Sequence, residues 1–327
     1  MRKASSVRGG GPKPNKNNSR PAVWKELEAW KLTSYGPWTE ALVKKSLRFH
    51  VDEARYKSAN GDYRSVVKLE VLDEDNHEFD ASGVLIGLDL VLTAAHNVRN
   101  SGGENNVSRA VSIKAYIGYH LQGSSLKGTG VQQRFGTTAI VLQEWKRSGF
   151  ASQNDMALIK LENKFTQVTP ALYQAPSLPV ETRVLVVGYP GENKKQVRGS
   201  CPHCQTAGCM YEVVGEAKQA TEKLLEYKLS TVSGNSGGPI FLDKMPRTVI
   251  ATHTGAVLDR VGINQATLVD VDFIEATKTF LSIPHSCSHR HVRMSRQGGS
   301  RFWSISLSIE VIPGITTPMP SRSRNQA

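Results

Sequence analysis

The 327-residue sequence has the composition of a globular protein whose positive charge lies at its two ends. The formal net charge is +12, and 39% hydrophobic residues with 21% charged residues are enough for a packed core. Residues 1–64 carry 14 Lys/Arg against 6 Asp/Glu, and residues 285–327 carry 6 against 1, so the segment between them is nearly neutral. A nucleic-acid-binding domain would concentrate basic residues on one folded unit. We therefore expect no specific nucleic-acid partner.

The sequence shows no recognisable targeting or membrane-spanning signal. The opening residues are basic, but no apolar run follows them, so no signal peptide is recognisable. No stretch reaches the roughly 20 apolar residues of a membrane span. The sequence predicts no membrane span and leaves the compartment open, because a misassigned start codon would hide a leader.

The first 64 residues divide into a polar tail and a segment with helical spacing. Residues 1–21 are rich in Gly, Pro, Asn, Lys and Arg and are predicted to be disordered. Within the segment 22–64, apolar residues recur at near-helical spacing between Ala22 and Ala54, interrupted by Tyr35-Gly36-Pro37. We expect two short helices there, either as a pro-segment or as an extension that packs on the core.

From residue 65 onward, short β-branched runs alternate with turn residues, which is typical of an all-β sandwich or barrel. The expected strands form two groups of about six, divided near residues 163–181. This pattern predicts two six-stranded antiparallel β-barrels, at about 65–165 and 180–270, within one domain of residues 65–284. The expected strands are 66–72, 81–86, 90–93, 111–119, 138–143, 156–161, 183–188, 211–217, 224–229, 239–242, 249–253 and 266–269.

A C-terminal helix and an irregular tail are expected after the barrels. Residues Val271–Leu281 carry apolar side chains at a spacing of three to four, which predicts a helix that closes the domain. Residues 285–327 are rich in Ser, Arg and Pro and are expected to be loose, apart from an apolar patch at Phe302–Ile312 that could form a strand.

Three short segments supply the residue types of nucleophilic catalysis. His96 ends an apolar strand, Asp155 directly precedes another, and Ser236 lies among glycines. A serine hydroxyl needs a hydrogen-bonded base, and the base needs a third group to orient it. Each segment alone is more often structural, but the chain order His, Asp, Ser in a β-rich context favours function. The sequence therefore predicts a catalytic triad of His96, Asp155 and Ser236.

The turn around the predicted nucleophile suggests an oxyanion hole. The segment Gly234–Pro239 reads GNSGGP, and its glycines allow a tight turn and close approach of a substrate. Backbone N–H groups in such a turn can converge on the oxygen that becomes negative during acyl transfer. Gly234 and Ser236 are the expected donors.

These segments resemble the signatures of a known enzyme family. LTAAH at 92–96, NDMALIKL at 154–161 and GNSGGPI at 234–240 are similar to the three signature segments of the chymotrypsin-like serine proteases, over roughly residues 65–283. The resemblance implies two barrels with the triad between them and endopeptidase activity on protein or peptide substrates. We expect a monomer that needs no cofactor. The alternative is a catalytically silent homologue that binds a partner through its cleft or basic tails.

Within that family, the sequence resembles the bacterial-type glutamyl endopeptidases. Asn235 precedes Ser236 where trypsin relatives have an Asp that pairs with a newly freed amino terminus, so trypsin-style activation is not expected. Thr231 and His253 match the Thr and His that bind a P1 carboxylate in this branch, and Gly255 completes the expected substrate-binding set. The resemblance implies a preference for Glu or Asp at P1, and the alternative is that His253 is a buried structural histidine.

Two features depart from the glutamyl endopeptidase pattern. Relatives often continue His-x-Gly-Gly, whereas this chain has Ala256 after Gly255. Some relatives also use the mature amino terminus as the cation of the pocket, which here would require processing near Arg64-Ser65.

Three of the four cysteines crowd into one short segment. Cys201, Cys204 and Cys209 include one Cys-x2-Cys half of a zinc site, which His203 or the distant Cys287, His289 and His291 could complete. A second pair at standard spacing is missing, so a loop disulfide or free thiols are favoured. A structural zinc bound by Cys201, Cys204 and Cys209 is the weaker alternative.

Overall fold

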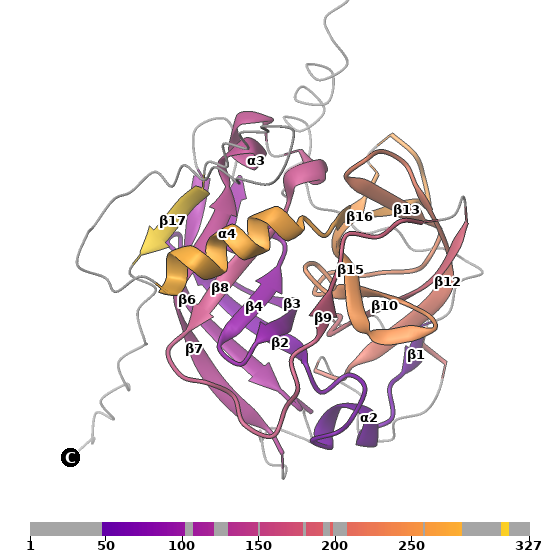
Figure 1. The fold of residues 1–327 in the computed structure, drawn as a ribbon, viewed down its shortest axis with the longest axis horizontal. Coiled ribbons are helices and arrows are strands. Elements are labelled where there is room, and N and C mark those ends of the chain that lie inside the picture. The colour runs from indigo at the N-terminus through magenta and orange to yellow at the C-terminus, as the bar shows by residue number, and fades with distance from the viewer. Residues whose placement is uncertain are drawn as a thin grey trace, which may run out of the picture.

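The computed structural model describes residues 48–101, 107–120, 130–149, 151–178, 181–191, 197–198, 208–257, 259–282 and 309–313. These residues form two antiparallel β-barrels that lie side by side, with one long helix outside them (Figure 1). Each barrel is a closed ring of six strands. The predicted fold class is therefore confirmed.

The first barrel closes through pairing of β6 with β7. Short helical segments η1 (Ala95–Asn97), α3 (Gln143–Arg147) and η2 (Ser152–Asn154) connect its strands. Two further strands, β5 (Arg99–Ser101) and β17 (Ile309–Pro313), extend its sheet beyond β6 and β7. In order around the barrel, the six strands are β2 (Val66–Asp73), β3 (Glu78–Gly87), β4 (Leu90–Thr93), β8 (Ala157–Leu161), β7 (Gln132–Leu142) and β6 (Val107–Ile117).

The second barrel closes through pairing of β10 with β12. Strand β9 (Leu172–Tyr173) runs parallel to β15, and β1 (Arg48–His50) lies between β12 and the short strand β11 (Val197–Arg198). In order around the barrel, the six strands are β10 (Thr182–Gly188), β14 (Pro239–Leu242), β15 (Met245–Ala256), β16 (Asn264–Leu268), β13 (Leu224–Tyr227) and β12 (Tyr211–Gln219).

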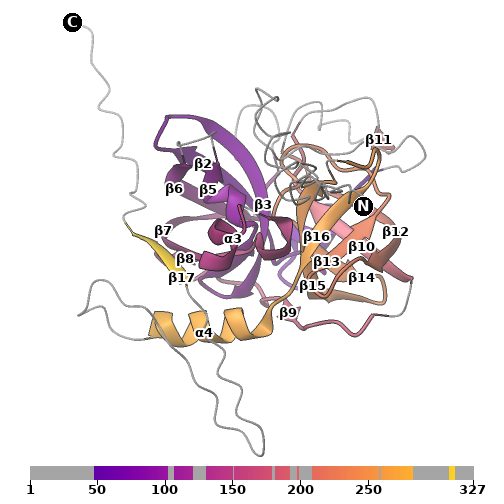
Figure 2. The ribbon, with the colours of Figure 1, turned by 90° about the horizontal axis from the view of Figure 1, so that it is seen from above.

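Helix α4 (Val271–Ser282) follows the second barrel in sequence but packs along the first (Figure 2). The Asp270 carboxylate accepts a hydrogen bond from the Phe273 N–H at 3.0 Å, which caps the first turn. Phe273 and Ile274 are fully buried in the apolar core, and α4 contacts β8. The helix therefore connects the two barrels. No helix in the described part of the chain is long and apolar enough to span a membrane.

The expected pair of helices before residue 65 lies mostly outside the described residues. Residues 22–47 lie outside the described residues, as do 1–21 and most of 285–327. Among residues 48–64, only α2 (Ala54–Lys57) is α-helical, and β1 is a strand whose Phe49 pairs with Glu212 of β12. The packed unit therefore extends back at least to Arg48.

Residues 48–64 are anchored by aromatic and charged side chains. Tyr63 is fully buried and stacks on Phe241 with ring centroids 5.9 Å apart. Its hydroxyl donates to Glu212 at 2.5 Å, and the Arg55 guanidinium binds the same carboxylate at 3.0 Å. Arg64 is only 2% exposed and donates to the carbonyl of Gln167 at 3.2 Å. An aromatic pair of this kind contributes about 0.5–1.5 kcal/mol beyond its burial, so this segment stabilises the barrels rather than covering them loosely.

Candidate active site

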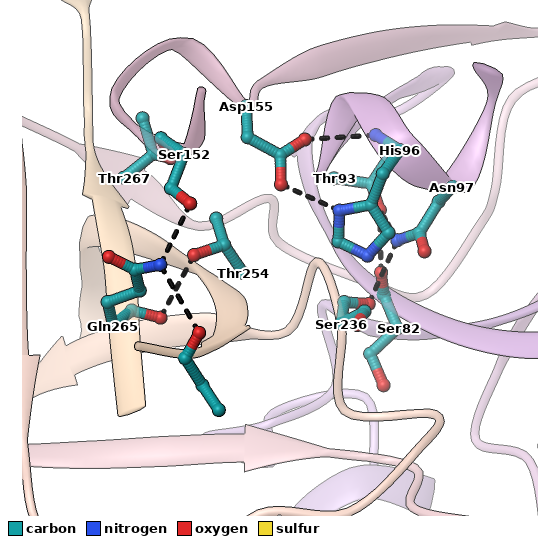
Figure 3. A network of polar contacts seen from close by, with 11 residues as sticks. Ser82, Thr93, His96, Asn97, Ser152, Asp155, Ser236, Thr254, Gln265 and Thr267 are labelled. Carbon is teal, nitrogen blue, oxygen red and sulfur yellow. Dashed lines mark hydrogen bonds and ion pairs between the residues drawn. The ribbon is translucent and has the colours of Figure 1, made fainter. Parts of the chain in front are cut away.

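His96 and Asp155 meet because their strands are neighbours in the first barrel. His96 lies in η1, shortly after β4, and Asp155 lies two residues before the start of β8, which pairs with β4 in antiparallel register. The His96 Nδ1 atom lies 2.6 Å from Asp155 Oδ2, and the His96 backbone N–H donates to Asp155 Oδ1 at 2.9 Å (Figure 3). The carboxylate is fully buried, and His96 is 6% exposed.

This double contact gives the imidazole a defined orientation. One carboxylate oxygen binds the backbone of His96, so the other faces its ring with little freedom to move. An acceptor at Nδ1 favours the tautomer that carries its proton there and leaves Nε2 as the basic nitrogen. In Figure 3, Ser236 lies on the side of the ring away from Asp155. The three predicted side chains thus gather at one place between the barrels.

The turn that carries Ser236 requires glycine. Gly237 has φ +80°, and a Cβ there would lie 2.1 Å from Thr93 Oγ1 and 2.4 Å from the carbonyl oxygen of Ser82. Gly234 has φ +94°, and a Cβ there would lie 2.6 Å from the carbonyl oxygen of Tyr189. Both positions combine a left-handed backbone with a close approach, which explains the glycines of the GNSGGP segment.

Side chains of the first barrel hold this turn in place. The Ser82 N–H and the Asn97 amide both donate to the carbonyl oxygen of Ser236 at 2.9 Å. The Ser82 hydroxyl donates to the carbonyl of Gly234 at 2.7 Å and accepts the N–H of Tyr189 at 2.8 Å. The sequence analysis identified neither Ser82 nor Asn97 as a support of this turn. A serine or an asparagine at these positions does not indicate this role until the turn that it contacts is known.

Tyr189 lies next to the turn, where its carbonyl oxygen approaches Gly234, and its hydroxyl stays protonated. It is almost fully buried, and this burial raises the pKa of its hydroxyl well above 10.0. Its ring contacts that of Tyr119 edge-on, with centroids 6.0 Å apart, and burial raises the pKa of Tyr119 to about 12. Both tyrosines are therefore uncharged at neutral pH.

The predicted oxyanion donors lie in this turn. The N–H of Gly237 donates to the carbonyl of His253 at 2.7 Å, and that of Gly238 donates to the carbonyl of Asn235 at 2.8 Å. Both of these N–H groups are therefore used in hydrogen bonds within the protein. The donor roles expected for Gly234 and Ser236 remain predictions.

Of the predicted substrate-binding residues, His253 is directly linked to the nucleophile turn. It lies on β15, where its N–H donates to the carbonyl of Gly238 at 2.9 Å. Thr231 precedes the same turn, and both side chains are fully buried. Gly255 has φ +142° and follows a bulge between β15 and β16.

Tyr227 on β13 is a contact of His253 that the sequence analysis missed. Its hydroxyl lies 2.5 Å from His253 Nδ1 and 3.2 Å from the carbonyl oxygen of Gln265. Strand β16 separates β13 from β15, so only the closed barrel brings the two side chains together. The contact fixes the direction of the His253 ring.

Gln265 and Thr267 on β16 connect the second barrel to the Asp155 segment. The Gln265 amide donates to the Ser152 hydroxyl at 2.8 Å, and the Thr267 hydroxyl donates to the Ser152 carbonyl (Figure 3). Ser152 begins η2, which leads to Asp155. The second barrel thereby supports the position of a carboxylate that belongs to the first.

Cys209 is disulfide-bonded, and Cys201, Cys204 and Cys287 lie outside the described residues. A disulfide sulfur is not a thiolate. The weaker zinc alternative through Cys201, Cys204 and Cys209 therefore does not apply while this bond is intact.

Comparisons with known proteins agree with this geometry. Residues 81–249 match the family described as "Trypsin-like peptidase domain". The glutamyl endopeptidase of Staphylococcus aureus strain MRSA252 is 28% identical over 207 residues, which cover 61% of this chain and 49% of that protein. For strain MW2 the identity is also 28% over 207 residues, covering 61% and 54%. The chain thus spans about half the length of the curated relatives it matches.

Two solved structures share the fold. One is described as "Structure of Glu endopeptidase in complex with MPD", with a TM-score of 0.57, 20% identity and coverage of 73% of this chain and 98% of that one. The other is a structure of HL collagenase, with a TM-score of 0.52, 16% identity and coverage of 72% and 97%. At these identities the likeness shows the double-barrel fold alone.

Proposed function

This chain belongs to the family of trypsin-like peptidase domains, and we propose that it is a serine endopeptidase with Ser236 as nucleophile, His96 as general base and Asp155 as orienting carboxylate. The observation that carries the proposal is the double contact of Asp155 with the ring and backbone of His96, beside the turn that presents Ser236. None of the three side chains is replaced, so the catalytically silent alternative has no support.

In the proposed reaction, Ser236 Oγ attacks the scissile carbonyl while His96 Nε2 takes its proton. Asp155 stabilises the imidazolium that forms, and His96 then gives the proton to the leaving amine. Water, activated by the same histidine, hydrolyses the acyl-enzyme. General base catalysis of this kind contributes about 10²–10⁴-fold to the rate. Each N–H donated to the oxyanion, from Gly234 and Ser236 in this proposal, contributes about 10²–10³-fold.

We further propose that the enzyme prefers Glu or Asp at P1. His253 lies next to the nucleophile turn, and its Nδ1 is bound by the Tyr227 hydroxyl. This contact fixes the ring, so that Nε2, when it carries a proton, can donate to a carboxylate together with the Thr231 hydroxyl. The glutamyl endopeptidase relatives support the same preference. Protein or peptide chains that contain acidic residues are the proposed substrates.

A fluorophosphonate probe tests the nucleophile directly. We expect the probe to label the wild-type chain covalently and to leave Ser236→Ala unlabelled, since it reacts with activated serines. Ser233→Ala is a matched control, because Ser233 lies in the same turn with an exposed side chain. Labelling that persists in Ser236→Ala, or a folded wild type that does not label, would overturn the proposal.

A further inference from the structure

The side chain of Asn97 connects the turn that carries the proposed base to the backbone of the proposed nucleophile. Asn97 directly follows His96 in η1 and is only 2% exposed. Its Nδ2 group donates to the carbonyl oxygen of Ser236 and to Thr93 Oγ1, each at 2.9 Å (Figure 3). One short side chain therefore links the neighbour of His96 to Ser236.

The available donors determine the direction of these hydrogen bonds. The carbonyl oxygen of Ser82 can only accept, and Thr93 Oγ1 lies 2.7 Å from it, so the single hydroxyl proton of Thr93 is used there. Thr93 Oγ1 must then accept the hydrogen bond from Asn97, which requires the NH₂ group, and not the amide oxygen, to face Thr93. The second hydrogen of that NH₂ group is left for the carbonyl of Ser236.

These hydrogen bonds form a closed ring around the carbonyl of Ser236. The Ser82 N–H donates to the same carbonyl oxygen at 2.9 Å and completes the ring of Ser82, Thr93, Asn97 and Ser236. Three of the four residues belong to the first barrel, where they lie on β3, at the end of β4 and at the end of η1. Since a buried polar group that loses its partner is costly, the ring resists displacement of Ser236.

The second barrel binds the other side of the same peptide group. The carbonyl of Ser236 is bound by the first barrel, while the N–H of Gly237 donates to the carbonyl of His253 on β15 at 2.7 Å. The fit is close, because a Cβ at Gly237 would lie 2.7 Å from Asn97 Nδ2. Asn97 ties this peptide group to the residue next to His96, so its hydrogen bond bears directly on where Ser236 lies relative to the base.

We propose that Asn97 is a positioning residue that sets the distance between Ser236 and His96, with Thr93 orienting its amide. The inference rests on the proposed function, because it needs Ser236 as nucleophile and His96 as base. In this role Asn97 acts through Ser236 and does not touch the substrate. A misplacement of reacting groups by about 1 Å can cost on the order of 10²-fold in rate. Loss of the Asn97 hydrogen bond should therefore slow acylation and leave substrate binding unchanged.

The kinetics of fluorophosphonate labelling separate positioning from folding. The endpoint of labelling counts the folded sites, whereas the rate constant measures how readily Ser236 reacts. Asn97→Leu, similar in size but without a donor, should lower the rate constant and kcat about 10–100-fold at an unchanged endpoint and KM. Thr93→Val should lower the rate constant less, because it only leaves the amide unoriented. Gln132→Leu is the matched control, since its amide donates to the carbonyl of Thr166 at 2.7 Å in an exposed position.

A His96→Ala background tests whether Asn97 acts through the pair of nucleophile and base. Residues that act as a unit have non-additive effects, so Asn97→Leu should change the residual peptide hydrolysis of the His96→Ala chain by no more than about threefold. The full loss of 10–100-fold in that background would indicate a general structural effect and would overturn the proposal.

The assay distinguishes failure of this inference from failure of the proposed function. A folded wild type that is not labelled overturns the proposed function, and this inference with it. A wild type that labels while Asn97→Leu labels at the same rate overturns this inference alone. If near-ultraviolet circular dichroism shows that Asn97→Leu does not fold, Thr93→Val decides, and an unchanged rate constant for that variant overturns the inference.

Discussion

Replacing Asp155 by asparagine tests the proposed triad at its most constrained point. The carboxylate uses one oxygen for the His96 backbone N–H at 2.9 Å and the other for His96 Nδ1 at 2.6 Å. An asparagine has only one such oxygen. If that oxygen stays on the backbone N–H, the amide NH₂ faces Nδ1 and donates to it, so the ring proton moves to Nε2. His96 can then no longer accept the proton of Ser236.

The opposite amide orientation is unfavourable at this position. It would place the NH₂ group against the His96 backbone N–H, so two donors would face each other in a buried site. A buried donor without an acceptor costs about 1–3 kcal/mol. We therefore expect the unproductive tautomer to dominate and kcat to fall by a factor on the order of 10⁴. That loss corresponds to about 5.4 kcal/mol of transition-state stabilisation.

The assay is steady-state hydrolysis of a fluorogenic peptide with Glu at P1. KM should change little, because Asp155 does not contact the substrate in the proposed mechanism. Asp89→Asn is a matched control, since it removes a partly exposed ion pair with Lys160 at 2.8 Å, away from the proposed triad, and should leave kcat unchanged. A kcat within tenfold of wild type for a folded Asp155→Asn variant would refute the reasoning about the tautomer.

Three further predictions concern the turn, the pocket and the anchored segment. Gly237→Ala should abolish fluorophosphonate labelling, because its Cβ would collide with Thr93, whereas Gly262→Ala, also at positive φ but with open space around it, should label normally. His253→Gln should lower the ratio of kcat/KM for Glu over Leu at P1 by about 10–100-fold in a peptide library, since a hydrogen bond to a charged group contributes about 1.5–3 kcal/mol. Equal cleavage after Glu and Leu by the wild type would remove the basis for that role. Burial and then the bond to Glu212 raise the pKa of Tyr63 above 10.0, so its contribution to stability is complete below pH 10.0 and is lost as the pH rises further. Tyr63→Phe should therefore flatten the fall of Tm above that pH, and an unchanged slope would contradict the assignment.

The sequence was most informative where one residue type can serve only one purpose. Strands β4 and β8 are short apolar runs, and the residues at their ends, His96 and Asp155, are brought together by strand pairing. Gly237 is likewise predictable, because no other residue fits its backbone without collision. Local propensity and chemistry therefore sufficed for the barrels and for the proposed catalytic residues.

The supporting residues could not be predicted in this way. Ser82, Tyr227 and Gln265 are ordinary polar residues of strands, and their roles depend on which segment faces them after the barrels close. Strand β1 has only three residues and no usable periodicity, and its partners come from far along the chain. Contacts between segments that are distant in the sequence determine where these residues lie.

The burial of Arg64 also bears on how such an enzyme could mature. Its guanidinium and the following Ser65 are almost inaccessible, so another protease could cut the Arg64–Ser65 bond only after local unfolding of a stabilising segment. Cleavage at that bond is thus a poor route to a new amino terminus. An acidic P1 side chain would then be bound by hydrogen bonds from the side chains of the proposed pocket rather than by an amino group freed at Ser65.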